Sequence, residues 1–171
     1  MHLIKLLDDK NYTSDLPVFH RDASRAIILR DGKLAMVHSL EEGYYEFPGG
    51  GVEAGESLVD AAIRETEEEV GLRVIRESVR EYGYIIERRH GHREDAIFEM
   101  NSYYFLADVE DVVADNELCE REASLGYVLE WVEPKKAYEA NISLSDSVGG
   151  TFLLRETEVL REIIEKLAEN P

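Results

Sequence analysis

The sequence contains a single cysteine and no long hydrophobic run. Because Cys119 stands alone, the chain cannot form an internal disulfide, and no His or Asn pattern around it indicates a nucleophile, so we expect a structural role. No segment approaches the roughly 20 apolar residues that a membrane span needs. Residues 1–12 carry charge from Lys5 onward and lack the long apolar core of a signal peptide. We therefore expect a cytoplasmic protein without a membrane partner.

Basic side chains are also scarce. The 171 residues include 19 Lys and Arg against 37 Asp and Glu, which gives a formal net charge of -18. Such a charge repels an approaching polyanion, so duplex nucleic acid is not expected as a partner. A small phosphorylated substrate is still compatible with this charge, because divalent metal and a few arginines can neutralise it locally.

The length and composition are those of one globular domain, 1–171, with 44% hydrophobic and 33% charged residues. Asp31-Gly32 predicts a hairpin turn between apolar runs at 24–29 and 34–37. Ser57 and Gly71 predict the ends of a helix over 57–70. Further strands are expected at 44–47, 73–75, 81–87, 96–108 and 127–132, and further helices at 134–140 and about 155–168. This order predicts an α/β or α+β fold with a mixed sheet sandwiched by helices.

The helix predicted over 57–70 has an acidic face. At about 100° per residue, Glu68 lies about 60° to one side of Glu65 and Glu69 about 40° to the other. Like charges at this spacing destabilise a helix by roughly a few tenths of a kcal/mol per pair unless a cation compensates. Oxygen ligands suit Mg²⁺ or Mn²⁺ rather than zinc. An isolated acidic helix face is more often simply solvated, so the residues around it must indicate whether this one binds metal.

That surrounding pattern is specific. Gly50 is followed after five residues by Glu56, and after seven more by Arg64-Glu65-Thr66-Glu67-Glu68-Glu69-Val70-Gly71-Leu72. This segment, 50–72, resembles the Nudix box at every fixed position, with Thr66 where the family usually has a larger aliphatic residue. The preceding Tyr45-Glu46-Phe47-Pro48-Gly49 also resembles the family's entry into the box.

The resemblance implies a Nudix-type α/β/α sandwich whose loop-helix-loop box holds cations against a pyrophosphate. At the matching positions, the implied metal ligands are Glu65, Glu68 and Glu69. Glu56 is implied as an accessory carboxylate, Arg64 would orient the acids, and Gly50 would bring a backbone carbonyl towards the metal. The implied cofactor is Mg²⁺, with Mn²⁺ as an alternative. The implied reaction is attack of water on one phosphorus, which leaves two phosphorylated products.

The general base is a separate question, because members of the family use either a box glutamate or a glutamate in a later loop. Glu117, Glu120 and Glu122 lie in an acidic segment that we predict to be a loop. Each of them could also be ordinary solvated charge. We choose Glu120, which joins Arg64, Glu65 and Glu68 in the predicted catalytic set.

The residues that contact substrate are predicted from basic and aromatic side chains. One basic cluster surrounds Gly91 in a predicted hairpin loop and could clamp a terminal phosphate or balance neighbouring acids: Arg88, Arg89, His90, His92 and Arg93. Arg25 lies on the first strand, near positions where related proteins contact substrate, although a strand arginine can equally pair with an acid. Tyr45 is one of several aromatic residues that offer a surface for a base, although core packing is the commoner role.

The predicted function is hydrolysis of a phosphoanhydride bond in a nucleoside diphosphate derivative such as ADP-ribose. The alternatives are an NTP pyrophosphohydrolase and, from a different class, a Nudix-fold sensor that binds nucleotide without hydrolysing it. Such sensors commonly lose box acids, whereas Glu65, Glu68 and Glu69 are all present here, which favours catalysis. The oligomeric state is left open, with a homodimer as one expectation because homodimers are frequent in the family.

Overall fold

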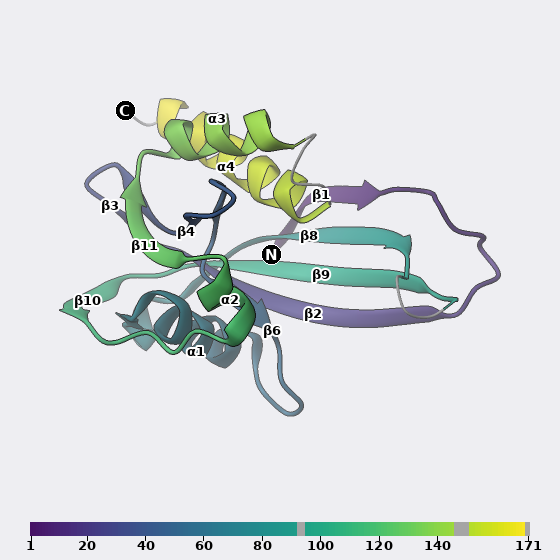
Figure 1. Cartoon of the computed structure of the whole chain (residues 1–171), viewed down its shortest axis with the longest axis horizontal. Helices are drawn as coiled ribbons and strands as arrows, with labels where there is room; N and C mark the ends of the chain where they lie inside the picture. The colour runs from purple at the N-terminus through teal and green to yellow at the C-terminus, as the bar shows by residue number, and fades with distance from the viewer. Residues whose placement is uncertain (92–94, 146–150, 170–171) are drawn as a thin grey trace.

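A large mixed sheet with helices on both faces forms the centre of the computed structural model, which describes residues 1–91, 95–145 and 151–169 (Figure 1). Its elements in chain order are β1 (His2–Asp8), β2 (Val18–Ile27), β3 (Leu29–Arg30), β4 (Lys33–Ser39), β5 (Tyr45–Glu46), β6 (Gly49–Gly51), α1 (Leu58–Val70), β7 (Leu72–Val74), β8 (Arg80–His90), β9 (Ile97–Leu106), β10 (Val109–Val113), α2 (Glu120–Ser124), β11 (Tyr127–Val132), α3 (Pro134–Leu144) and α4 (Thr151–Glu169). Among these described residues, no helix is long and apolar enough to cross a membrane.

The largest sheet has the strand order β1-β8-β9-β2-β6. It is mixed, because β1 pairs parallel with β8 and β2 parallel with β9, whereas β8 with β9 and β2 with β6 are antiparallel. A smaller sheet has the order β11-β4-β3, with β5 also paired to β4. Figure 1 shows α1 and α2 on one side of the large sheet and α3 and α4 on the other. The predicted α/β/α arrangement with a mixed sheet is therefore confirmed.

The alternation of side chains along β2 divides the core into two clusters. Ala26 belongs to the cluster that contains Val70 of α1, whereas Ile27 belongs to the cluster that contains Leu160 of α4. Ala26 and Ile27 are each 1% exposed, and successive residues of a strand point to opposite faces. Residues of β2 therefore reach both helix layers, and the candidate site is built around this strand.

The elements with strong local signals form where the sequence predicts them. Ser57 caps α1 by accepting a hydrogen bond from the Asp60 backbone nitrogen at 3.1 Å, and Gly71 ends the helix with a φ of 67°. Asp31 and Gly32 connect β3 to β4 with positive φ angles of 51° and 74°, as a tight hairpin turn requires. These turns and caps depend only on neighbouring residues.

Other boundaries differ from the prediction. The predicted strand 24–29 is divided, since β2 ends at Ile27 in the large sheet and Leu29–Arg30 pairs with β4. The strand predicted at 96–108 is likewise divided into β9 and β10. Both α3 and α4 extend beyond the predicted 134–140 and 155–168, because they pack against each other. No strand is predicted for β1, where a register shift between Leu3 and Lys5 interrupts the alternation.

Candidate active site

Three successive glycines bring the start of the box against β2 and α1. Gly49–Gly51 forms β6, which pairs antiparallel with β2. Gly49 has a φ of 151°, and a Cβ there would clash with the Ser24 carbonyl oxygen. A Cβ on Gly50 would lie 2.5 Å from the Glu65 carboxyl group. Bare backbone is therefore required at Gly49, and at Gly50 it leaves room for the Glu65 carboxyl group directly beside the box loop.

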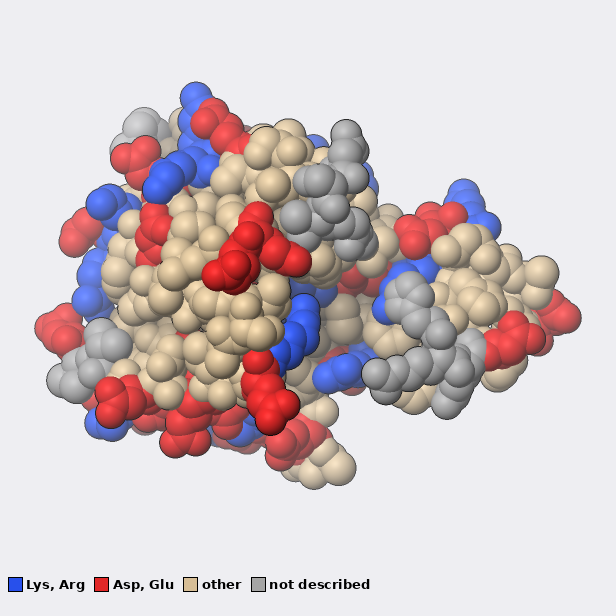
Figure 2. All heavy atoms as spheres, in the orientation of Figure 1, with Lys and Arg blue, Asp and Glu red and all other residues tan. Residues whose placement is uncertain are grey.

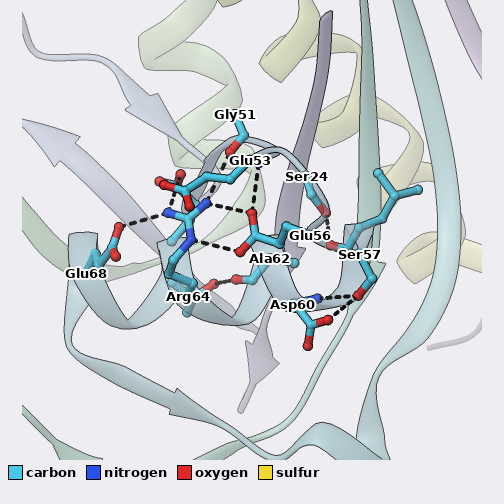
Figure 3. Close-up of polar contacts among 12 residues, drawn as sticks. Ser24, Gly51, Glu53, Glu56, Ser57, Asp60, Ala62, Arg64 and Glu68 are labelled. Atoms are coloured by element: carbon cyan, nitrogen blue, oxygen red, sulfur yellow. Dashed lines mark hydrogen bonds and ion pairs between the residues drawn. The ribbon is translucent and has the colours of Figure 1, made fainter.

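Arg64 gathers the acids of α1 and of the preceding loop, as Figure 3 shows. Its Nε donates to Glu56 at 2.9 Å, and its Nη1 donates to Glu65 at 2.8 Å and to Glu68 at 3.0 Å. Its Nη2 donates to the Gly51 carbonyl oxygen at 3.1 Å. The hydrogen bond from Arg64 lowers the pKa of the Glu56 carboxyl group. These contacts are the ones that an orienting role for Arg64 requires.

The three carboxylates predicted to bind metal lie in different environments. Glu69 is 6% exposed, and burial, followed by the charge of Glu46, raises its pKa well above the ordinary value. Burial also raises the pKa of Glu65, against the opposing effect of Arg64. The side chain of Glu68 is 40% exposed and turns towards Arg64. Glu69 is thus buried, Glu65 is half-buried with a side chain 16% exposed, and Glu68 remains nearer the surface.

Glu65 and Glu69 line a cavity of about 410 Å³. Its acidic side chains are Glu46, Glu65, Glu69 and Glu122, and its basic side chains are Arg21, Arg25, Arg121 and Arg155. Met100, Tyr127 and Phe152 add less polar surface. Figure 2 shows basic side chains inside the hollow that separates the main body from the projecting part of the sheet. A cavity that combines carboxylates with guanidinium groups can hold a cation and a phosphate together.

Two of these arginines belong to a buried network of charged groups. Arg155 of α4 donates from Nη1 to Glu87 at 2.9 Å and from Nε to Glu156 at 2.8 Å. Arg155, Glu87 and Glu156 are each at most 2% exposed. Nη1 of Arg25 donates to Ser102 at 3.2 Å, and its Nε lies 3.6 Å from Glu156 Oε1. Two cations and two anions balance one another, which fixes both arginines at the cavity.

The acidic segment after β10 contains the short helix α2, whereas the sequence predicts a loop there. Glu120 is exposed and is not among the described residues that line the cavity. Glu122 is half-buried and does line it, and its carboxylate accepts a hydrogen bond from the Cys119 backbone nitrogen at 2.8 Å. Glu117 lines a separate hollow. Residues two apart in a helix differ by about 200° in direction, so Glu122 and Glu120 face different ways.

Of the described residues predicted to bind substrate, Arg25 lines the cavity, whereas Tyr45, Arg88 and Arg89 do not. Tyr45 is 3% exposed, stacks on His38 and donates from its hydroxyl to Glu130 at 3.0 Å, so it lies in the core. Neighbouring strand residues point to opposite faces, and Glu46 faces the cavity instead.

The described residues of the basic cluster at the end of β8 do not line the cavity. Arg88 forms an ion pair with Glu99, and the guanidinium of Arg89 lies 4.3 Å from the ring centroid of Phe98. His90 lies 3.2 Å from Asp95. The two other members of the predicted cluster, His92 and Arg93, lie outside the described residues.

Sequence reasoning missed four of the charged cavity residues: Glu46, Arg21, Arg121 and Arg155. Alternate residues of a strand point to the same face, so the position of Arg21 on β2 indicated that it lies on the same face as Arg25. The same alternation indicates that Tyr45 and Glu46 face opposite ways, but it does not indicate which of them faces the cavity. No local pattern indicated Arg155, because only the packing of α4 brings it to the sheet.

The carboxylates of half-buried Glu65 and buried Glu69 fit a hard divalent cation that is shared with substrate. Within the described ranges, no three His, Cys, Asp or Glu side chains are arranged to hold a metal ion by themselves. Mg²⁺ commonly binds through one or two carboxylates, keeps several waters and leaves positions for substrate phosphates. Glu65 and Glu69 supply two carboxylates, and their raised pKa values reflect first burial and then neighbouring negative charge, both of which a bound cation would offset.

Comparisons with known proteins agree with the box and the fold. A NUDIX hydrolase from Nitrosomonas europaea is 20% identical, with a TM-score of 0.55, over 72% of this chain and 79% of that one. The E. coli ORF135 protein is 21% identical, with a TM-score of 0.57, over 93% of this chain and 97% of its own. A search of curated proteins finds no matching sequence. At these identities the solved structures support the fold alone. The family model of the NUDIX domain, however, matches residues 19–148, and the chain therefore belongs to the Nudix family.

Proposed function

We propose that this protein is a Mg²⁺-dependent hydrolase, with Mn²⁺ as a substitute metal, that splits a phosphoanhydride bond in a small nucleoside diphosphate derivative such as ADP-ribose. The observation that carries the proposal is the cavity of about 410 Å³ in which Glu65 and Glu69 meet four arginines. Neighbouring carboxylates that are shielded from water are stabilised in their charged form by a cation beside them. Guanidinium groups bind phosphate oxygens. A metal-bound diphosphate satisfies both requirements in one site.

Glu65 and Glu69 would hold the metal, with Glu68 and the Gly50 carbonyl oxygen as the further ligands that the box implies. When bound, a divalent cation polarises the attacking water and neutralises charge on the leaving phosphate. Arg64 fixes the Glu65 carboxylate through its hydrogen bond of 2.8 Å and ties it to Glu56 on the box loop. The chain's own contribution is thus a set of carboxylates whose positions are fixed before substrate arrives.

The reaction forms one bond and breaks one bond. A water oxygen bonds to one phosphorus, the bridging oxygen leaves with the other phosphate, and a proton of the water passes to a carboxylate. We assign that carboxylate to Glu122, because it lines the cavity and is held by the Cys119 backbone nitrogen at 2.8 Å. Arg21 and Arg121, which also line the cavity, would bind the phosphate oxygens.

Glu122→Gln is expected to lower kcat by roughly 10²–10⁴-fold, the usual contribution of a general base. Glu120→Gln is the matched control, because it removes the same charge from the same short helix at a residue outside the described cavity lining. Steady-state kinetics of the two variants at saturating Mg²⁺ measure the difference. Equal turnover of the two variants would remove Glu122 from the mechanism.

Hydrolysis is favoured over binding without turnover, because Glu65, Glu68 and Glu69 are all present and Arg64 holds two of them at 2.8 and 3.0 Å. Among substrates, an NTP is the alternative to a nucleoside diphosphate derivative, since both contain the bond that this site would break.

The proposal is tested by measuring product release from ADP-ribose, nucleotide sugars, dinucleoside polyphosphates and NTPs. Turnover of one class in the presence of Mg²⁺ is expected, with complete loss in EDTA and recovery when Mg²⁺ or Mn²⁺ is added back. Hydrolysis that persists in EDTA would overturn the metal-dependent mechanism. Binding of a nucleotide without turnover across the whole set would instead support the sensor.

A further inference from the structure

The row of β2 side chains that lines the cavity continues beyond it along one face of the large sheet. Alternate residues of β2 point to the same face, so Arg25, Ala23, Arg21 and Phe19 form a row. Arg25, Ala23 and Arg21 line the cavity, and Phe19 is the next member of the row. At about 3.3 Å per residue, Phe19 lies about 7 Å beyond Arg21.

The neighbouring strands continue the same row. In the register of the sheet, Phe19 pairs with Phe98 of β9, and Phe98 pairs with Arg89 of β8. The adjacent register position contains Arg21 and Met100, and both of these residues line the cavity. Phe19, Phe98 and Arg89 therefore stand side by side, one step along the sheet from the wall of the cavity.

The three side chains already form a stack. The rings of Phe19 and Phe98 lie 6.1 Å apart at 28°, and the Arg89 guanidinium lies 4.3 Å from the Phe98 centroid. Phe19 nevertheless remains 53% exposed. The strands that carry these residues project beyond the helix layers (Figure 1). An exposed phenylalanine at the end of an aromatic stack, beside an ionic cavity, offers a surface to a planar group.

We propose that Phe19, Phe98 and Arg89 form an outer subsite that stacks a second aromatic ring of the substrate. The inference rests on the proposed function, because it assumes that a diphosphate occupies the cavity. The substrate class is then a dinucleoside diphosphate or polyphosphate, in which the phosphates join two ring-bearing groups. Arg21 and Arg89 supply positive charge along the row. A long polynucleotide is disfavoured by the net charge of -18.

The test compares two substrates that differ only in the second ring: diadenosine diphosphate, and ADP-ribose, which lacks the second adenine. Phe19→Ala is expected to raise KM and lower kcat/KM about tenfold or more for diadenosine diphosphate, the order expected for one base-aromatic stack. It should leave kcat/KM for ADP-ribose unchanged, and Phe19→Trp should retain the preference. Val18→Ala is the matched control, because Val18 is 57% exposed on the opposite face of β2 and should affect neither substrate.

An equal effect of Phe19→Ala on both substrates, or no effect on either, would overturn the outer subsite and leave the proposed hydrolysis standing. If the wild-type protein hydrolyses neither compound, the proposed function fails for these substrates and calorimetric binding decides the subsite separately. Diadenosine diphosphate should then bind Phe19→Ala about tenfold more weakly than wild type. Equal affinity for the two proteins would overturn the subsite.

Discussion

Glu69→Gln is expected to lower turnover at least about a hundredfold while the protein remains folded, since losing one preorganised electrostatic group typically costs about 10²–10³ in kcat. Glutamine keeps the shape of the side chain and an oxygen that can accept the hydrogen bond from the Gly49 backbone nitrogen, now 2.8 Å long. It removes the negative charge that would hold the metal. Steady-state kinetics at saturating Mg²⁺ measure the loss.

The stability of the same variant separates a functional role from a structural one. Burial raises the pKa of Glu69 well above its ordinary value. Its contribution to stability is therefore largest at low pH and is lost as the pH rises through the folded-state pKa. Because glutamine does not ionise, the Tm of metal-free Glu69→Gln at neutral pH should equal or exceed that of wild type. Added Mg²⁺ should raise the Tm of wild type more than that of the variant.

Glu67→Gln is the matched control on the same helix. The Glu67 side chain is 44% exposed and lies 3.7 Å from Arg73, on the other side of α1 from the cavity residues. Its replacement should leave both turnover and the Mg²⁺ response of the Tm unchanged. Near-normal turnover of Glu69→Gln, or an equal loss in Glu67→Gln, would contradict the assignment of Glu69 as a metal ligand.

The acidic half of the site could be predicted because its signals are local. Ser57 and Gly71 define the ends of α1, and the spacing of Glu65 and Glu69 places both carboxylates on one side of it. The structure adds what spacing alone does not contain. Burial distinguishes Glu65 and Glu69 from Glu68, whose side chain is 40% exposed, and Arg64 ties Glu65 to Glu56 of the box loop. Both effects arise from packing of the helix against the sheet and the box loop.

The basic half of the site could not be predicted in the same way. Arg155 reaches the cavity because α4 packs on the large sheet, where it meets Glu87 of β8, 68 positions away in the chain. Tyr45 and Glu46 show a different difficulty, because the sequence does not say which face of a two-residue strand turns inward. The structure puts Tyr45 in the core and Glu46 at the cavity. Contacts between residues far apart in the chain determine both the position of Arg155 and the orientation of Tyr45 and Glu46. A local sequence pattern contains no information about such contacts.

Arg155→Met is expected to reduce the free energy of unfolding by about 3–5 kcal/mol, the usual result of removing one partner from a buried ion pair. Methionine fills much of the same volume but removes the guanidinium that donates to Glu87 at 2.9 Å and to Glu156 at 2.8 Å. Both carboxylates are buried, at 2% and 0% exposed, and would lose this cation. For a chain of this length, such a loss corresponds to a fall in Tm of roughly 6–20 °C. Urea denaturation monitored by circular dichroism measures it.

Two further variants on α4 show whether the effect comes from the buried charges. Arg161→Met removes an exposed arginine whose side chain is 49% exposed and pairs with Glu158, and it should cost less than about 1 kcal/mol. Arg155→Lys retains the charge but lacks the planar fork that bridges two carboxylates, so its stability should lie between that of wild type and Arg155→Met. If Arg155→Met were no less stable than Arg161→Met, Glu87 and Glu156 would not depend on this guanidinium. The ion-pair network would then not explain why Arg25 and Arg155 are fixed at the cavity. Contact with substrate would be the remaining reason for a buried arginine at residue 155.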